Sequence, residues 1–99
     1  MPSFAVITEE GPRWDKKKRI DQQDGWNEHF EFMSALVSEG FVLLGGPLEN
    51  HSKIQALLIV DAPDEATVRS RLSKEPFMRS GVLEIAKLYS WEIRYGRLP

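Results

Sequence analysis

The sequence predicts an α+β domain in which strands and helices follow one another in the order β-α-β-β-α-β. Four short segments are rich in β-branched and aromatic residues and are bounded by glycine, proline or acidic residues, which is typical of strands. Two segments between them carry apolar residues at helical spacing. A chain of 99 residues has room for one hydrophobic core and not for two, so we expect a single domain.

The first strand is predicted at residues 4–8, inside the sheet, because neither alternating set of its residues is polar. Residues 9–24 show no clear period and are predicted to form a long loop. Loops of this length inside a small domain are usually functional or disordered. Trp14 favours an ordered loop, because exposing a tryptophan to water is unfavourable.

A helix is predicted at residues 26–39, with Asp24 as its N-cap and a stop at Gly40. At about 100° per residue, four apolar residues form a narrow stripe with Leu36 beside it. The stripe consists of Trp26, Phe30, Met33 and Val37. His29 falls on the same side as Leu36, so we expect its imidazole near the edge of the buried face.

The later part of the chain predicts strands at 41–44 and 54–60, a helix at 64–73 and a strand at 82–95. A short turn joins the two middle strands, which predicts an antiparallel hairpin. Asp64 is a suitable N-cap, and Pro76 ends the helix because it disfavours helical geometry at Glu75. The last strand is expected to place on one face Leu83, Ile85, Tyr89, Trp91, Ile93 and Tyr95.

Short, right-handed connections between these elements give one antiparallel four-stranded sheet with both helices on one face, the ferredoxin-like arrangement. The two middle strands are apolar on both faces. The uncovered face would then be an apolar patch of a kind that monomers rarely tolerate. We therefore predict a homodimer in which two sheets pack face to face, with the long last strand reaching onto the partner.

Composition argues against several classes of function. The net charge of −2 gives no electrostatic basis for binding nucleic acid or acidic membranes. Cysteine is absent and the two histidines are far apart, so neither a disulfide nor a metal site is expected. Nucleotide-binding glycine motifs and a nucleophile elbow are also missing, so no cofactor is expected. The sequence shows no signal peptide and no apolar run of about 20 residues, which predicts a cytoplasmic protein.

Two residues are candidates for acid–base chemistry. His29 can exchange a proton near neutral pH, although a packing histidine with a hydrogen bond is the alternative. Glu75 lies between a helix end and a proline, where a carboxylate can point inward, although most glutamates are solvated. If the two met, the carboxylate would orient the imidazole, but their spacing does not show that they meet. His51 lies in a polar turn and is predicted to be exposed.

Aromatic and basic residues are candidates for ligand binding. Trp14, Trp26 and Phe77 could line an aromatic pocket, although core packing is the commoner place for each. The basic run at residues 16–19 predicts a solvated loop. In the alternative interpretation, Arg19 faces the pocket and holds an anionic group of a small-molecule ligand.

Three stretches of the chain resemble the YCII-related family. They are HFEFMSALVSEGFVLLGGP at residues 29–47, LLIVDAPDEATVRSRL at 57–72 and EPFMRSGVLEI at 75–85. Their order and spacing identify residues 1–99 as a single YCII-like domain. The resemblance implies a ferredoxin-like fold, a dimeric α+β barrel and an active site built on a histidine and an aspartate. His29 matches the histidine, and Glu75 stands where the family has aspartate before proline and an aromatic residue.

Glu75 keeps the charge of the family's aspartate but adds a methylene group, and shifts of about 1 Å can lower a rate on the order of a hundredfold. The family includes a dehydrochlorinase of a chlorinated hydroxyquinol, and muconolactone isomerases share the barrel. The resemblance therefore implies proton transfer on small ring compounds. Our first hypothesis is a lyase or isomerase in which His29 is the acid or base and Glu75 orients it. The alternatives are a non-catalytic ligand-binding homodimer and an accessory domain that acts through partner proteins.

Overall fold

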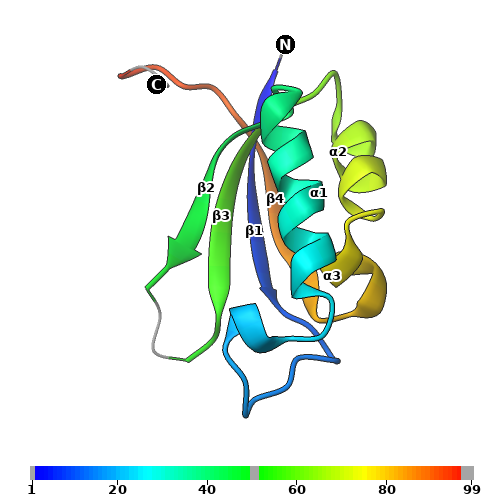
Figure 1. Cartoon of the computed structure of the whole chain (residues 1–99). Coiled ribbons are helices and arrows are strands. Elements are labelled where there is room, and N and C mark those ends of the chain that lie inside the picture. The colour runs from blue at the N-terminus through cyan, green and yellow to red at the C-terminus, as the bar shows by residue number, and fades with distance from the viewer. Residues whose placement is uncertain (1, 50–51, 97–99) are drawn as a thin grey trace.

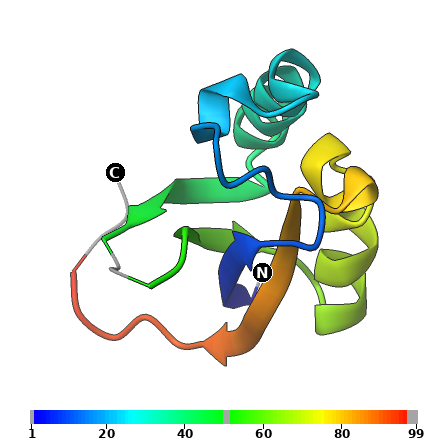
Figure 2. The same ribbon diagram turned by 90° about the horizontal axis from the view of Figure 1, so that it is seen from below.

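One layer of the molecule is a four-stranded antiparallel sheet, and the helices form a second layer on one of its faces (Figures 1 and 2). The computed structural model describes residues 2–49 and 52–96. Its elements are β1 (Ser3–Glu10), η1 (Ile20–Gln22), α1 (Trp26–Ser38), β2 (Val42–Leu48), β3 (Gln55–Asp61), α2 (Glu65–Leu72), α3 (Pro76–Ser80) and β4 (Leu83–Trp91). The strand order is β2-β3-β1-β4, and every neighbouring pair is antiparallel. The predicted ferredoxin-like fold is confirmed.

The main core lies between the sheet and the helices. Phe4 and Val6 point inward from β1 and pack with Leu36 of α1 and with Val68 and Leu72 of α2. Fully burying such a side chain contributes about 1.5–3 kcal/mol. Asp64 caps α2 as predicted, and hydrogen bonds from the hydroxyl and the backbone N–H of Thr67 lower the pKa of its carboxyl.

α1 has side-chain contacts at its C-terminal end but no side-chain cap at its N-terminal end. At its C-terminal end, Arg71 of α2 bonds the carboxylate of Glu39 at 2.6 Å and lies 4.5 Å from the ring centre of Phe41. Gly40, at φ 80°, ends the helix as predicted. At the other end the N-cap is Gly25, with no side-chain hydrogen bond, so the prediction of Asp24 as the cap is wrong.

The apolar stripe of α1 packs only in part against the buried clusters, through Met33 and Trp26. Leu36 is buried, whereas Phe30 and Val37 are exposed. All four residues of the predicted stripe line a cavity between α1 and the sheet. The helix is therefore rotated from the orientation that its apolar spacing predicts, because part of its apolar surface forms a cavity wall.

A third helix begins where the sequence predicted only the end of the second. Glu75 has an extended backbone, at φ −67° and ψ 133°, as expected for a residue before proline. Its side chain accepts a hydrogen bond from the backbone N–H of Met78, and Pro76 occupies the start of α3. Gly81, at φ 87°, ends the helix. An N-terminal proline and a C-terminal glycine are the usual signals of a helix, here one of only five residues.

β4 contains a β-bulge. Ile7 of β1 pairs with Lys87, but the next residue, Thr8, pairs with Ile85. Ala86 is therefore the extra residue on β4. Because a bulge shifts the alternation of side chains by one position, Ile85 faces the core whereas Lys87 faces away from it.

The face of the sheet away from the helices carries apolar residues. Tyr89 is 51% exposed and Trp91 is 43% exposed, and the strand pairings place them on the same face as Ile7, Leu44 and Leu57. The prediction that Tyr89 and Trp91 share a face with Leu83 and Ile85 is wrong because the bulge lies between the two pairs. β4 also ends at Trp91, earlier than predicted.

The hairpin of β2 and β3 is confirmed, and β2 runs through the Gly45-Gly46-Pro47 segment to Leu48. Its turn includes His51, which lies outside the described residues, so the predicted exposure of His51 stays a prediction.

Candidate active site

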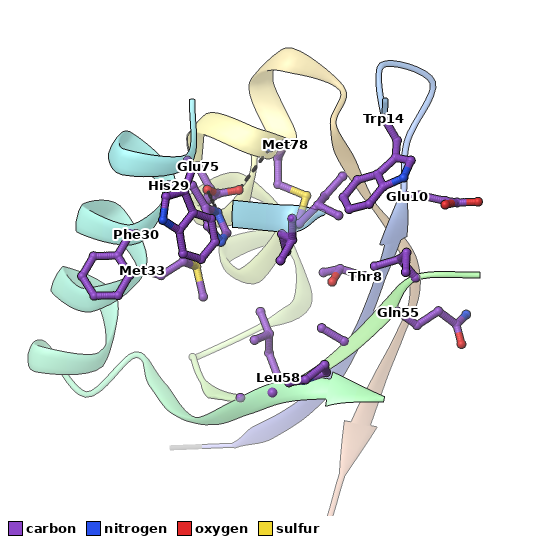
Figure 3. Close-up of a pocket in the computed structure, with 18 of the residues that line it drawn as sticks. Thr8, Glu10, Trp14, His29, Phe30, Met33, Gln55, Leu58, Glu75 and Met78 are labelled. Carbon is purple, nitrogen blue, oxygen red and sulfur yellow. Dashed lines mark hydrogen bonds and ion pairs between the residues drawn. The ribbon is translucent and has the colours of Figure 1, made fainter. Parts of the chain in front are cut away.

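A cavity of about 1090 Å³ lies between α1, the inner face of the sheet and the loop that precedes α1 (Figure 3). The N-terminal half of α1 packs on α3, where the rings of Trp26 and His29 contact Phe77. Phe77 of α3 heads a second buried cluster, against which Trp14, Trp26 and Met78 pack. The volume is sufficient for a small organic molecule.

The glycines of β2 contribute to the shape of this cavity. A Cβ atom added at Gly45 would lie 2.7 Å from Cδ2 of Leu58, which is closer than real Cβ contacts allow. The neighbouring Gly46 would meet no atom within 4 Å. The absence of a side chain at Gly45 therefore leaves room for the Leu58 side chain in the cavity wall, whereas Gly46 has free space around it.

His29 and Glu75 meet in the wall of the cavity, although they lie 46 positions apart in the sequence (Figure 3). Oε1 of Glu75 bonds Nδ1 of His29, and Oε2 accepts the backbone N–H of Met78 at 3.1 Å. The Glu75 side chain is 1% exposed and the His29 side chain is 14% exposed. An ionised carboxylate only accepts hydrogen bonds, so the pairing of an ionised Glu75 with a neutral His29 places the proton on Nδ1 and leaves Nε2 with a free electron pair.

The imidazole ring is fixed by aromatic neighbours as well as by the carboxylate. It stacks on Phe77, with ring centres 4.2 Å apart and an angle of 13° between the planes. The ring of Trp26 lies 5.5 Å away on the same helix. These contacts leave the imidazole little freedom to turn, so its ring nitrogens have fixed directions.

The other predicted ligand-binding residues have different positions. Trp14 and Trp26 line the cavity. Phe77 is fully buried behind His29 and is not part of the cavity lining. Arg19 lies at the cavity, but its side chain is 76% exposed and its Nε is 3.3 Å from Oδ1 of Asp21. The structure therefore brings both tryptophans to the cavity, uses Phe77 as a support for the imidazole and leaves Arg19 at the rim.

The loop before α1 forms a basic rim. The side chains that line the cavity there are Lys16, Lys17, Lys18 and Arg19, and Lys53 joins them from the segment before β3. Gln23 holds this loop in place. Its amide nitrogen donates to the backbone oxygens of Asp15 and Lys18 at 2.9 and 3.1 Å, and its oxygen accepts the N–H of Asp15 at 3.0 Å.

The sequence did not predict a place at the site for Gln23, Thr8 or Met78, and it predicted Met33 only as part of the apolar stripe of the helix. Gln23 lies in a segment without a period, so no pattern indicates that its side chain is buried. Thr8 did give a signal, because it continues the inward series of Phe4 and Val6 along β1. A hydroxyl group at an inward position of a strand is unfavourable unless it forms a hydrogen bond, so such a position can indicate a functional role.

The described residues contain no group of three His, Asp or Glu side chains that could hold a metal ion. Within the same residues, every helix is too short or too polar to cross a bilayer.

Comparisons with known proteins agree with the fold and identify a family. Curated protein sequences give no match. The structure is similar to 5-chloro-2-hydroxyhydroquinone dehydrochlorinase (TftG) from Burkholderia phenoliruptrix AC1100, solved in complex with 2,5-dihydroxybenzoquinone. The TM-score is 0.61 at 19% sequence identity, over 94% of this chain and 95% of that chain. The family description "YCII-related domain" matches residues 11–92, which is most of the sequence. The resemblance is thus confirmed, and the chain belongs to the YCII-related family.

Proposed function

We propose that this protein is a small-molecule enzyme that transfers a proton on a ring compound, as a lyase or an isomerase. In this proposal His29 is the general acid or base and Glu75 is the residue that orients it. The observation that carries the proposal is the bond from Nδ1 of His29 to a buried carboxylate at the wall of a cavity. It leaves Nε2 unprotonated in the neutral ring, and histidine is suited to proton transfer near neutral pH.

The proposed step begins when Nε2 of His29 takes a proton from a carbon or hydroxyl group of the ligand. The imidazolium that forms lies against the carboxylate of Glu75, which stabilises the new positive charge. In an isomerase the proton returns to another atom of the ligand. In a lyase the electron pair of the broken bond to hydrogen forms a double bond in the ligand, the leaving group departs with its own bonding pair, and the imidazolium gives its proton to the leaving group or to water. A positioned acid or base of this kind contributes about 10²–10⁴-fold to a rate.

The substrate class that we propose is a flat ring compound with a negative charge or an acidic hydroxyl group. Trp14, Trp26 and Phe30 provide aromatic surface in the cavity, and the rim is basic. Arg19 could reach an anionic group by leaving Asp21, since its contact with that carboxylate is exposed. The ring compound bound to the structurally similar dehydrochlorinase is consistent with this class.

We further propose that the protein is a homodimer whose partner covers the open face of the sheet. The apolar residues on this face include Tyr89, Trp91 and Leu44, and each is at least 40% exposed in the single chain. A patch of this kind is typical of an interaction surface. Burying it between two identical sheets would remove the patch from water.

Hydrogen–deuterium exchange on candidate ring compounds tests the enzymatic role without knowledge of the full reaction. Hydroxylated aromatic and quinone compounds are incubated in D₂O with the protein, and loss of ring protons is followed by NMR. We expect the protein to accelerate the exchange of ring protons in at least one compound. In His29→Asn the exchange rate should be lower by about 10²-fold or more. Glu31→Gln is the matched control, since Glu31 lies on α1, is exposed and does not line the cavity.

The second candidate function is ligand binding without catalysis. It is favoured by one observation, namely that Glu75 already has a structural role as the N-cap of α3. The same experiment distinguishes the two functions. If the protein binds a ring compound but exchange is equal in the protein and in His29→Asn, the enzymatic proposal is refuted and the binding function remains.

A further inference from the structure

Thr8 is a buried polar residue that has no role in the proposed proton transfer. Its backbone lies in the middle of the sheet, paired with Ala56 on β3 and Ile85 on β4. The residue is 3% exposed and continues the inward series of β1, in which the preceding members belong to the core. Packing alone would be served equally well by valine, which has the same shape without the hydroxyl group.

The hydroxyl group of Thr8 faces the cavity. Within residues 2–49 and 52–96, no hydrogen bond involves this side chain, and every side-chain nitrogen or oxygen that is shut off from solvent has a partner. The Thr8 hydroxyl is therefore not shut off. Thr8 lines the cavity and is otherwise buried, so the exposed part of its hydroxyl group faces the cavity.

Thr8 is chemically distinct among the buried residues of the cavity wall. These residues are Thr8, Val42, Leu58, Leu72, Glu75 and Leu83. Only Thr8 and Glu75 of this set are polar, and both oxygens of Glu75 are already bonded, to His29 and to Met78. Thr8 is thus the one member of the set with a free hydrogen-bonding group.

The position of Thr8 relates it to the proposed proton transfer. His29 and Glu75 lie on the helical side of the cavity, whereas Thr8 lies on the sheet (Figure 3). The β-bulge on β4 begins next to Thr8, and bulges often occur beside binding sites, where they re-aim side chains. A ring compound that reaches His29 with one edge would present its opposite edge to the sheet.

We infer that Thr8 determines ligand specificity by hydrogen-bonding an oxygen substituent on the edge of the ring that lies away from His29. This inference rests on the proposed function for the class of ligand. A threonine hydroxyl both donates and accepts, so it suits a carbonyl, hydroxyl or phenolate oxygen. The preferred ligands are therefore rings with oxygen at opposite positions, and rings with a single oxygen bind more weakly.

The test compares hydroquinone, which has hydroxyl groups at opposite positions of the ring, with phenol, which has one. Dissociation constants are measured by NMR titration for the unmodified protein, Thr8→Val and Thr8→Ser. We expect the unmodified protein to prefer hydroquinone by about fivefold, the effect of one neutral hydrogen bond. Thr8→Val should lose the preference and bind phenol as before, whereas Thr8→Ser should keep it.

Urea unfolding of the ligand-free proteins adds a readout that does not depend on ligand. Because the Thr8 hydroxyl has no partner in the protein, Thr8→Val should unfold at the same or a higher urea concentration. A structural hydroxyl would instead make Thr8→Val less stable. The inference is overturned if Thr8→Val keeps the preference for hydroquinone, is clearly destabilised, or if neither compound binds the unmodified protein at millimolar concentration.

These measurements are independent of the proposed catalysis. If deuterium exchange fails but Thr8→Val loses the preference, the role of Thr8 stands and the enzymatic function falls. If exchange depends on His29 but the preference persists in Thr8→Val, the enzymatic function stands and the role of Thr8 is refuted.

Discussion

Replacing Glu75 by glutamine should move the proton of His29 from one ring nitrogen to the other. Glu75 uses each of its oxygens once, for Nδ1 of His29 and for the N–H of Met78. Glutamine has one oxygen and one NH₂ group. If its oxygen keeps the cap on α3, its NH₂ group faces Nδ1, which must then accept. The proton of the neutral imidazole therefore moves to Nε2, the nitrogen that we propose as the base.

Glu75→Gln should cost the protein less stability than Glu75→Ala, because glutamine can keep the helix cap. Glu75→Gln retains the helix cap and replaces a charge-assisted hydrogen bond by a neutral one, so the free energy of unfolding should fall by about 1 kcal/mol. Glu75→Ala removes the cap, worth about 1 kcal/mol, and also leaves Nδ1–H unpaired in a partly buried position. We expect it to lose about 2–4 kcal/mol. The catalytic rate of Glu75→Gln should fall on the order of 10⁴-fold, which is the size of loss seen when a catalytic histidine has the wrong tautomer. This loss would far exceed what the small change in stability explains.

Long-range ¹H–¹⁵N NMR of the imidazole ring, with urea unfolding beside it, measures both quantities. The spectra are recorded at a pH where the ring is neutral. Glu84→Gln is the control, because Glu84 is exposed on β4 and does not line the cavity. The reasoning is refuted if His29 carries its proton on Nε2 in the unmodified protein, or if Glu75→Gln keeps the Nδ1–H form.

Two further predictions concern the dimer and the cavity wall. Replacing both Tyr89 and Trp91 by lysine should reduce the mass in solution from two chains to one, because charges would then lie on the proposed interface. Tyr95→Lys should leave the mass unchanged, since Tyr95 is exposed beyond the end of β4, and a one-chain mass for the unmodified protein at micromolar concentration would contradict the homodimer. Gly45→Ala should force Leu58 from its place, lower the free energy of unfolding by about 1–3 kcal/mol and weaken ring binding, as urea unfolding and titration would show. Gly46→Ala is the matched control, and equal effects of the two substitutions would argue against this role of Gly45.

The order of the four strands and of α1 and α2 could be predicted from the sequence because it depends on local patterns and short connections. The partly buried position of His29 also followed from its spacing along the helix. The rotation of α1 could not be predicted from the sequence, because an apolar stripe that lines a cavity has the same spacing as one that packs in a core. The bulge at Ala86 was equally hidden, since the pattern of β4 shows apolar residues without showing where the alternation shifts.

The sequence predicts what His29 and Glu75 would do if they met, but it does not predict that they meet. The two lie 46 positions apart, and their contact depends on where the start of α3 places its N-cap residue, Glu75. α3 itself was missed because its Glu-Pro start follows α2 after two residues and was interpreted as a helix end. Phe77 illustrates the same limit. Its aromatic ring suggested a ligand contact, but the packing of α3 against α1 places it behind the imidazole.

The central claim is that Nε2 of His29 is the nitrogen that meets a ring compound. It is tested most directly by following the ¹⁵N shift of each imidazole nitrogen while a ring compound that the protein binds is added. We predict that Nε2 shifts as it takes up or shares a proton, while Nδ1 keeps its proton and its bond to Glu75. A ring compound that binds in the cavity and leaves Nε2 unchanged, or one that displaces the proton from Nδ1, would contradict the claim.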